Sequence, residues 1–119
     1  MHPISIGRIG EPARESGAYR VLVDRLWPRG IKKEQALWDE WMPSVAPSSA
    51  LRTWYHSHRV QRDAFRQQYL LELQQPAIQE ELNHLRTIAE QTPIILLTFS
   101  RDVDGSQVPL LRDFLLQSL

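Results

Sequence analysis

The chain has 119 residues and no cysteine. Disulfide bonds, thiolate metal sites and cysteine nucleophiles are therefore excluded. No stretch of the sequence approaches the roughly 18 apolar residues that a membrane helix needs. The segment from Met1 to Gly10 also lacks the basic start and long apolar run of a secretion signal. We therefore expect a cytoplasmic protein that does not associate with a membrane.

Lysine is scarce, although cationic side chains as a whole are not. Lys and Arg together number 14 and balance 14 Asp and Glu, so no global charge attracts nucleic acid or an anionic membrane. Lys32 and Lys33 are the only lysines. Arginine offers a planar fork for carboxylate or phosphate and stacks on aromatic rings. The bias favours local anion sites, while genomic base composition and ordinary solvated helix faces remain the simpler explanation.

Several well-known catalytic and nucleotide-binding signatures are absent. The chain contains no Gly-x-Gly-x-x-Gly, Gly-x-x-x-x-Gly-Lys-Ser/Thr, His-Glu-x-x-His or Gly-x-Ser-x-Gly motif. The sequence therefore predicts no cofactor and leaves enzymatic activity open. His56 and His58 would face different sides of a helix, so we expect no metal site there. His56 remains a candidate general acid or base, but its spacing assigns it no partner.

Three segments have the composition of β-strands: Ile4–Ile9, Tyr19–Asp24 and Ile94–Phe99. The last is a continuous apolar run, which predicts the central strand of a sheet covered on both faces. Helical spacing or capping residues predict five helices: Glu34–Met42 with Leu37, Trp38 and Trp41 buried, one capped by Ser48, one over Val60–Gln74, one beginning at Pro76 and one from about Gln107.

This order of elements predicts one α/β domain over residues 1–119. Strands separated by helices favour a small three-layer sandwich, in which helices flank a short, mainly parallel sheet. Three strands make a small sheet, and the pattern is compatible with one more.

Two polar loops follow predicted strands, and they are the candidate ligand site. They run from Asp24 to Gly30 and from Ser100 to Gln107. In open α/β sheets, ligands bind beyond the carboxyl ends of the strands. Guanidinium groups and the free N–H groups at a helix start suit phosphate or carboxylate, and a tryptophan can stack on a base. The predicted ligand-binding residues are Asp24, Arg25, Trp27, Arg29, Arg101, Asp102 and Ser106.

A structural role for the same residues is equally compatible with the sequence. Asp24 could pair with Arg101, or Asp102 with Arg25, and such ion pairs would simply tie the two loops together. Both roles can coexist, because an ion pair between loops can also support a ligand site. The leading hypothesis is a site for a small anionic, nucleotide-like molecule, used for binding or for modest enzymatic conversion.

Two alternatives come from other classes of protein. A nucleic-acid-associated function would rest on the arginine bias and on exposed helix faces that carry Arg52, Arg59, Arg62 and Arg66, although acidic residues balance these charges. A partner-binding domain without a ligand would be favoured if the tryptophan-rich segment formed an exposed apolar patch. Trp38, Trp41 and Trp54 lie on predicted apolar helix faces, where core packing is the better interpretation. The sequence does not determine an oligomeric state.

The run from Tyr19 to Gly30, Tyr-Arg-Val-Leu-Val-Asp-Arg-Leu-Trp-Pro-Arg-Gly, is long and specific. It resembles the signature of the domain of unknown function 488 family of bacterial proteins, in its YeaO-like branch. The resemblance spans nearly the whole chain, and it continues through Trp41, Ala46-Pro47-Ser48, Leu51-Arg52, Trp54-Tyr55-His56, Phe65-Arg66, Tyr69, Glu72-Leu73, Arg101-Asp102, Leu111 and Phe114-Leu115.

The resemblance implies a compact α/β fold and a bacterial intracellular protein, in a family whose activity is not established. Similar family members often carry His-Asn-His before the last helix, where this chain has Gly105-Ser106-Gln107. If those histidines serve catalysis in relatives, their absence here weakens an enzymatic role and favours binding. The chain also has His58-Arg59 where an Asp-Pro pair is common.

Overall fold

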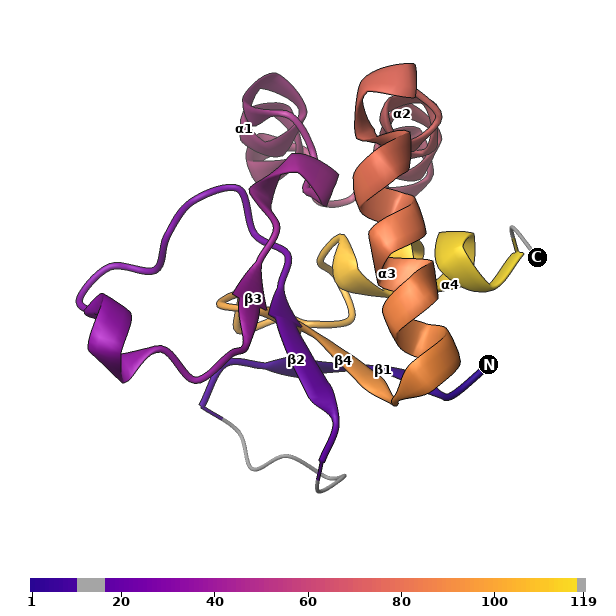
Figure 1. The fold of residues 1–119 in the computed structure, drawn as a ribbon. Coiled ribbons are helices and arrows are strands. Elements are labelled where there is room, and N and C mark those ends of the chain that lie inside the picture. Colours follow the sequence, from indigo (N-terminus) through magenta and orange to yellow (C-terminus); the bar gives the residue numbers. More distant parts are fainter. Residues whose placement is uncertain (11–16, 118–119) are drawn as a thin grey trace.

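The computed structural model describes residues 1–10 and 17–117. Its sheet has four parallel strands in the order β1-β4-β2-β3 (Figure 1). The strands are β1 (Ile4–Arg8), β2 (Tyr19–Leu22), β3 (Glu40–Trp41) and β4 (Ile94–Thr98). β4 pairs with both β1 and β2, so the prediction of a central apolar strand is confirmed. The parallel sheet also confirms the α/β fold class.

Four α-helices follow the predicted pattern. They are α1 (Ser49–Ser57), α2 (Arg62–Leu73), α3 (Gln79–Gln91) and α4 (Val108–Gln117). Pro76 begins a short 3-10 turn that leads into α3, as expected for proline in a first turn. Within the two described ranges, no helix is long and apolar enough to cross a membrane.

The helix predicted over Glu34–Met42 is wrong. A single 3-10 turn spans Lys33–Gln35, and the chain then forms the short strand β3 beside β2. The backbone N–H groups of Asp39 and Met42 donate to Arg20 and Leu22 of β2 rather than to a preceding turn. The helix-like spacing of Trp38 and Trp41 reflected contacts with the sheet, because tertiary pairing overrides weak local propensity.

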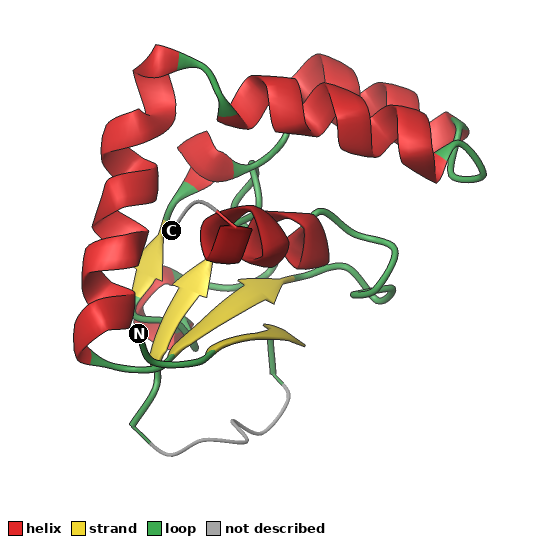
Figure 2. Ribbon diagram, turned by 90° about the vertical axis from the view of Figure 1, so that its right-hand side faces the viewer, coloured by secondary structure: helices red, strands yellow, loops and turns green. Residues whose placement is uncertain are grey.

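Two hydrophobic clusters cover opposite faces of the sheet. One joins the strand residues Ile4, Val21, Ile94 and Leu96 to the buried sides of all four α-helices. The other joins Leu22, Ile95 and Leu97 to tryptophans of the segment 25–41. Figure 2 shows the α-helices gathered on one side of the strands. The predicted helical covering is thus present on one face, whereas a tryptophan-rich loop with one 3-10 turn covers the other.

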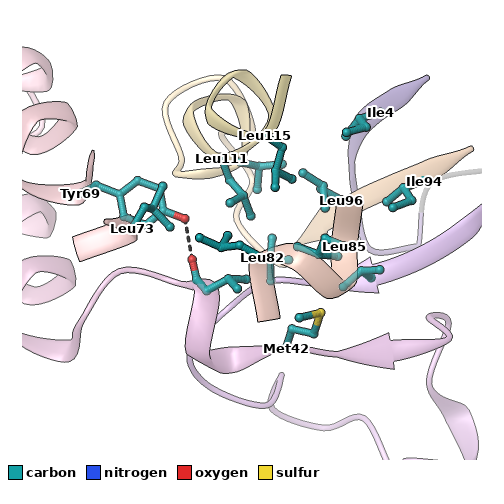
Figure 3. Packing of buried hydrophobic residues seen from close by; sticks show 14 of the residues in the cluster. Ile4, Met42, Tyr69, Leu73, Leu82, Leu85, Ile94, Leu96, Leu111 and Leu115 are labelled. Atoms are coloured by element: carbon teal, nitrogen blue, oxygen red, sulfur yellow. Dashed lines mark hydrogen bonds between the residues drawn. The ribbon is translucent and has the colours of Figure 1, made fainter. Parts of the chain in front are cut away.

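Tyr69 is a fully buried polar side chain in the larger cluster (Figure 3). Its hydroxyl donates to the carbonyl oxygen of Val45 at 2.6 Å. Burial raises the pKa of Tyr69, because removal from water disfavours the phenolate. The hydrogen bond fixes α2 against the segment that leads into α1.

Ser48 caps α1 as predicted and also joins it to α2. Its Oγ accepts from the backbone N–H of Leu51 at 3.2 Å. The carboxylate of Glu72 accepts from the Ser48 hydroxyl at 2.6 Å and from the Ser48 backbone N–H at 2.7 Å. One carboxylate near the end of α2 therefore holds the start of α1.

Asp24 joins the ends of the two central strands. Its carboxylate accepts from the Thr98 hydroxyl at 2.7 Å and from the Phe99 backbone N–H at 2.7 Å. The amide of Gln107, just before α4, donates to the same carboxylate at 3.0 Å. One side chain therefore fixes the relative positions of both loops that leave the sheet at this edge.

We expect Ser48→Ala to lower the free energy of unfolding by about 1–2 kcal/mol, because the variant loses the N-cap and one partner of Glu72. Urea unfolding measures this change. Ser49→Ala is the matched control, since Ser49 is exposed and its replacement should cost less than about 0.5 kcal/mol. Equal losses in the two variants would contradict a specific capping role for Ser48.

Asp24→Ala should lower the free energy of unfolding by about 3 kcal/mol, because it leaves three donors without their charged acceptor. Asp104→Ala removes an exposed carboxylate from the neighbouring loop and serves as the control. It should change the free energy by less than about 0.5 kcal/mol. If Asp24→Ala is as stable as the control in urea, the junction does not hold this edge of the sheet together.

Candidate functional site

A pocket of about 560 Å³ opens at the carboxyl ends of β2 and β4. Its wall consists of residues 24–29, 98–100 and 105–107, together with residues from α1 and the segment before it, Arg59 after α1 and Phe65 of α2. The volume lies in the usual range for small-molecule sites. Its place also agrees with the rule that ligands bind where parallel strands end.

Five of the seven predicted site residues line this pocket: Asp24, Arg25, Trp27, Arg29 and Ser106. Arg101 and Asp102 are not among the lining residues. Arg101 is exposed, whereas Asp102 forms an ion pair with Arg59 at 2.9 Å. The structure thus brings the two predicted loops together, and a ligand at them stays a prediction.

The two ion pairs considered between the loops are both absent among the described residues. Asp24 binds Thr98, Phe99 and Gln107 instead of Arg101. Arg25 donates to the carbonyl oxygens of Ala46 and Pro47, at 2.8 Å and 3.1 Å, rather than to Asp102. Backbone carbonyls close in space satisfy Arg25, and sequence spacing does not reveal such partners.

The helix α1 contributes Arg52, Tyr55 and His56 to the pocket wall, and our sequence prediction of the site missed this contribution. Arg52 and His56 are four residues apart, so their side chains lie on one face of the helix. That spacing was visible in the sequence. It carried no information about which loops the face would meet, because the contact is made across the fold.

The carbonyl oxygen of Gly105 accepts hydrogen bonds from three side chains of the α1–α2 region. The hydroxyl of Tyr55 donates to it at 2.9 Å, and the Arg62 guanidinium donates at 2.8 Å. Arg59 donates to it at 3.3 Å and lies over the Tyr55 ring, 4.9 Å from its centroid. The loop before α4 is thereby held against the two helices.

Trp27 anchors the other loop of the pocket. Its indole N–H donates to the carbonyl oxygen of Ile31 at 2.6 Å, and its ring packs edge-on against Trp38 and Trp41. The N–H of Trp41 donates to the carbonyl oxygen of Asp24 at 2.8 Å. These tryptophans contact each other and the sheet, and they do not form an exposed patch. The exposed apolar side chains of the pocket wall are instead Leu26 and Phe99.

Most polar groups of the wall already have partners within the protein. Each hydroxyl donates to a protein oxygen: Thr98 to Asp24, Ser100 to the Asp102 carbonyl, Ser106 to the Val103 carbonyl and Tyr55 to the Gly105 carbonyl. The wall has one carboxylate, that of Asp24, and three donors occupy it.

Arg29, Arg52 and His56 are the exceptions on the pocket wall. All three are exposed, and none of their side chains makes a hydrogen bond or ion pair with any residue that the structure describes. The groups left for a ligand are therefore two guanidiniums and an imidazole. Across residues 1–10 and 17–117, no cluster of three or more histidines or carboxylates could hold a metal ion.

Comparisons with known proteins place the chain in a family. The model of a family described as the inactive DUF488-N3 subclade matches residues 3–119. The chain is 41% identical to the Escherichia coli protein YeaO, an alignment that covers 94% of this chain and 96% of YeaO. It is 36% identical to the Mycobacterium tuberculosis protein Rv3073c, over 94% of this chain and 92% of that protein. No solved structure matches. The predicted family resemblance is confirmed, and the chain belongs to the inactive DUF488-N3 subclade of the domain of unknown function 488 family.

Proposed function

We propose that this protein binds a small anionic, nucleotide-like molecule in the pocket at the ends of β2 and β4, without converting it. The observation that carries this proposal is the identity of the unpartnered groups. Arg29, Arg52 and His56 line the pocket and have no partner among the described residues. An anion supplies the acceptors that these donors lack.

The balance of charge in the wall also favours an anion. Four arginines line the pocket, whereas Asp24 is the single carboxylate. The N-terminus of α4 adds to the positive potential, because Ser106 and Gln107 immediately precede this helix and line the same pocket. Backbone N–H groups at a helix start attract negative charge.

The apolar part of the wall favours a ligand with a flat or hydrophobic portion. Leu26 and Phe99 are 57% and 46% exposed, so a bound molecule can cover them. Trp27 lines the same pocket and is held by its hydrogen bond to Ile31. Exposed aromatic and apolar surface beside arginine suits a base or another flat ring. Together these features support an anionic group attached to a ring.

Binding without catalysis agrees with the hydrogen-bond partners of the hydroxyls and the imidazole in the pocket wall. The hydroxyls of Ser100, Ser106 and Tyr55 donate to backbone carbonyls, which cannot take a proton from a nucleophile. Thr98 donates to the Asp24 carboxylate but is only 1% exposed, so a ligand does not reach its hydroxyl. His56 has no described residue that orients its ring. Gln107 binds Asp24 in the segment where the family resemblance implies histidine in other members. The description of the family as inactive points the same way.

The test is a thermal-shift screen of nucleotides, sugar phosphates and carboxylates, followed by calorimetric titration of any molecule that stabilises the protein. A ligand at about ten times its Kd should raise the Tm by about 5 °C. Arg52→Gln should weaken binding by about tenfold or more, because the variant loses a charged donor to the anion. Arg66→Gln removes an exposed charge from α2 outside the pocket wall and should leave the Kd unchanged.

Two results would contradict this proposal. One is the absence of any stabilising anion at millimolar concentration. The other is equal weakening by Arg52→Gln and Arg66→Gln, together with binding of oligonucleotides that falls steeply with salt. That pattern would indicate a diffuse nucleic-acid surface on the helices instead of a pocket.

A further inference from the structure

Arg59 lies in the pocket wall and is paired with a carboxylate outside it. Its Nη2 is 2.9 Å from Oδ2 of Asp102, which does not line the pocket. The side chains are 42% and 63% exposed, respectively. Ion pairs as exposed as this one are weak, because water and salt screen them. Arg59 can therefore leave Asp102 at little cost when a stronger anion is present.

Gly105 makes this arrangement possible. A Cβ added at Gly105 would collide with the Asp102 carboxylate and lie 2.6 Å from Nη2 of Arg59. The other oxygen of Asp102 accepts from the Gly105 backbone N–H at 3.1 Å, so Asp102 keeps a partner when Arg59 leaves. Arg59 also lies over the Tyr55 ring, which keeps its guanidinium at the pocket wall. Exchange of partners thus moves the Arg59 side chain alone, which gives up Asp102 and its 3.3 Å hydrogen bond to the Gly105 carbonyl.

We propose that the anionic group of the ligand is a phosphate monoester and that Arg59 selects it. A dianionic phosphate takes the Arg59 guanidinium from Asp102, whereas a carboxylate does not. This inference rests on the proposed function, because it concerns the ligand of the same pocket. It adds the chemical class of the anion and a residue that determines specificity.

The positive charges of the pocket wall favour a dianionic ligand over a monoanionic one. Arg29 and Arg52 have no carboxylate partner among the described residues, which leaves two positive charges for the ligand. A phosphate monoester carries up to two negative charges near neutral pH and offers three acceptor oxygens, so it can bind more than one guanidinium. A ligand carboxylate would replace Asp102 with an equal charge and gain nothing at Arg59. A dianion is attracted more strongly than a monoanion by each of Arg29, Arg52 and Arg59, which line the same pocket.

The test compares phenyl phosphate with benzoate at about pH 8, where the phosphate carries two charges. Calorimetric titration of the parent protein should give a Kd at least about tenfold lower for phenyl phosphate, because it gains a charged contact. Asp102→Asn frees Arg59 for either anion but keeps an oxygen for the Gly105 N–H. It should improve benzoate binding by about two- to fivefold and reduce the preference for phosphate.

Two controls separate Arg59 from general charge effects. Asp104→Asn removes an exposed carboxylate from the same loop without freeing Arg59, and it should leave the preference for phosphate as in the parent. In an Arg59→Gln background, the preference for phosphate should be lower than in the parent, because only Arg29 and Arg52 remain, and Asp102→Asn should have no further effect. A Tm for each variant confirms that it is folded.

The outcomes distinguish the two proposals. Suppose that phenyl phosphate binds and that Arg52→Gln weakens its binding, but that Asp102→Asn and Asp104→Asn change the preference for phosphate over benzoate equally. Arg59 then does not select the anion, whereas anion binding in the pocket is still supported. Persistence of the Asp102→Asn effect in the Arg59→Gln background has the same meaning. If benzoate binds more tightly than phenyl phosphate, the phosphate class is wrong. If the parent protein binds neither compound and no other anion in the screen, both proposals fail.

Discussion

The carboxylate of Asp24 is the contact on which the pocket-bearing edge of the sheet depends. It accepts from the Thr98 hydroxyl, the Phe99 backbone N–H and the Gln107 amide, so it joins β2, β4 and the start of α4. A carboxylate that binds three donors is a strong local restraint. Asp24 thereby builds the pocket wall, and three donors of the protein already use most of its roughly four lone-pair sites.

Two further groups of contacts hold the wall of the pocket in place. On one side, Trp27 packs against Trp38 and Trp41 on the sheet face that none of the described α-helices covers. On the other, the Gly105 carbonyl binds Tyr55 and Arg62, which joins the loop before α4 to the helix pair. Among the described residues, the side chains of Arg29 and Arg52 in this wall remain without a hydrogen-bond or ion-pair partner.

Local sequence patterns predicted most of the fold correctly. They failed where hydrogen bonds between segments distant in sequence determined the secondary structure. Ser48 as an N-cap and Ile94–Phe99 as the central strand depended on neighbouring residues, and both are confirmed. The segment Glu34–Met42 was predicted as a helix because its tryptophans have helical spacing. Hydrogen bonds to β2 convert part of it into a strand, which a periodicity argument does not detect.

The sequence by itself determined the α/β class, the family and the two loops that follow β2 and β4, because these depend on composition, periodicity and a contiguous signature. Only the tertiary structure decided which side chains of those loops are free. Asp24 and Arg25 are occupied, Arg101 lies outside the pocket wall, and Arg52 enters it from α1. The physical reason is that hydrogen-bond partners are chosen in space: Asp24 and Phe99 are 75 positions apart in the chain.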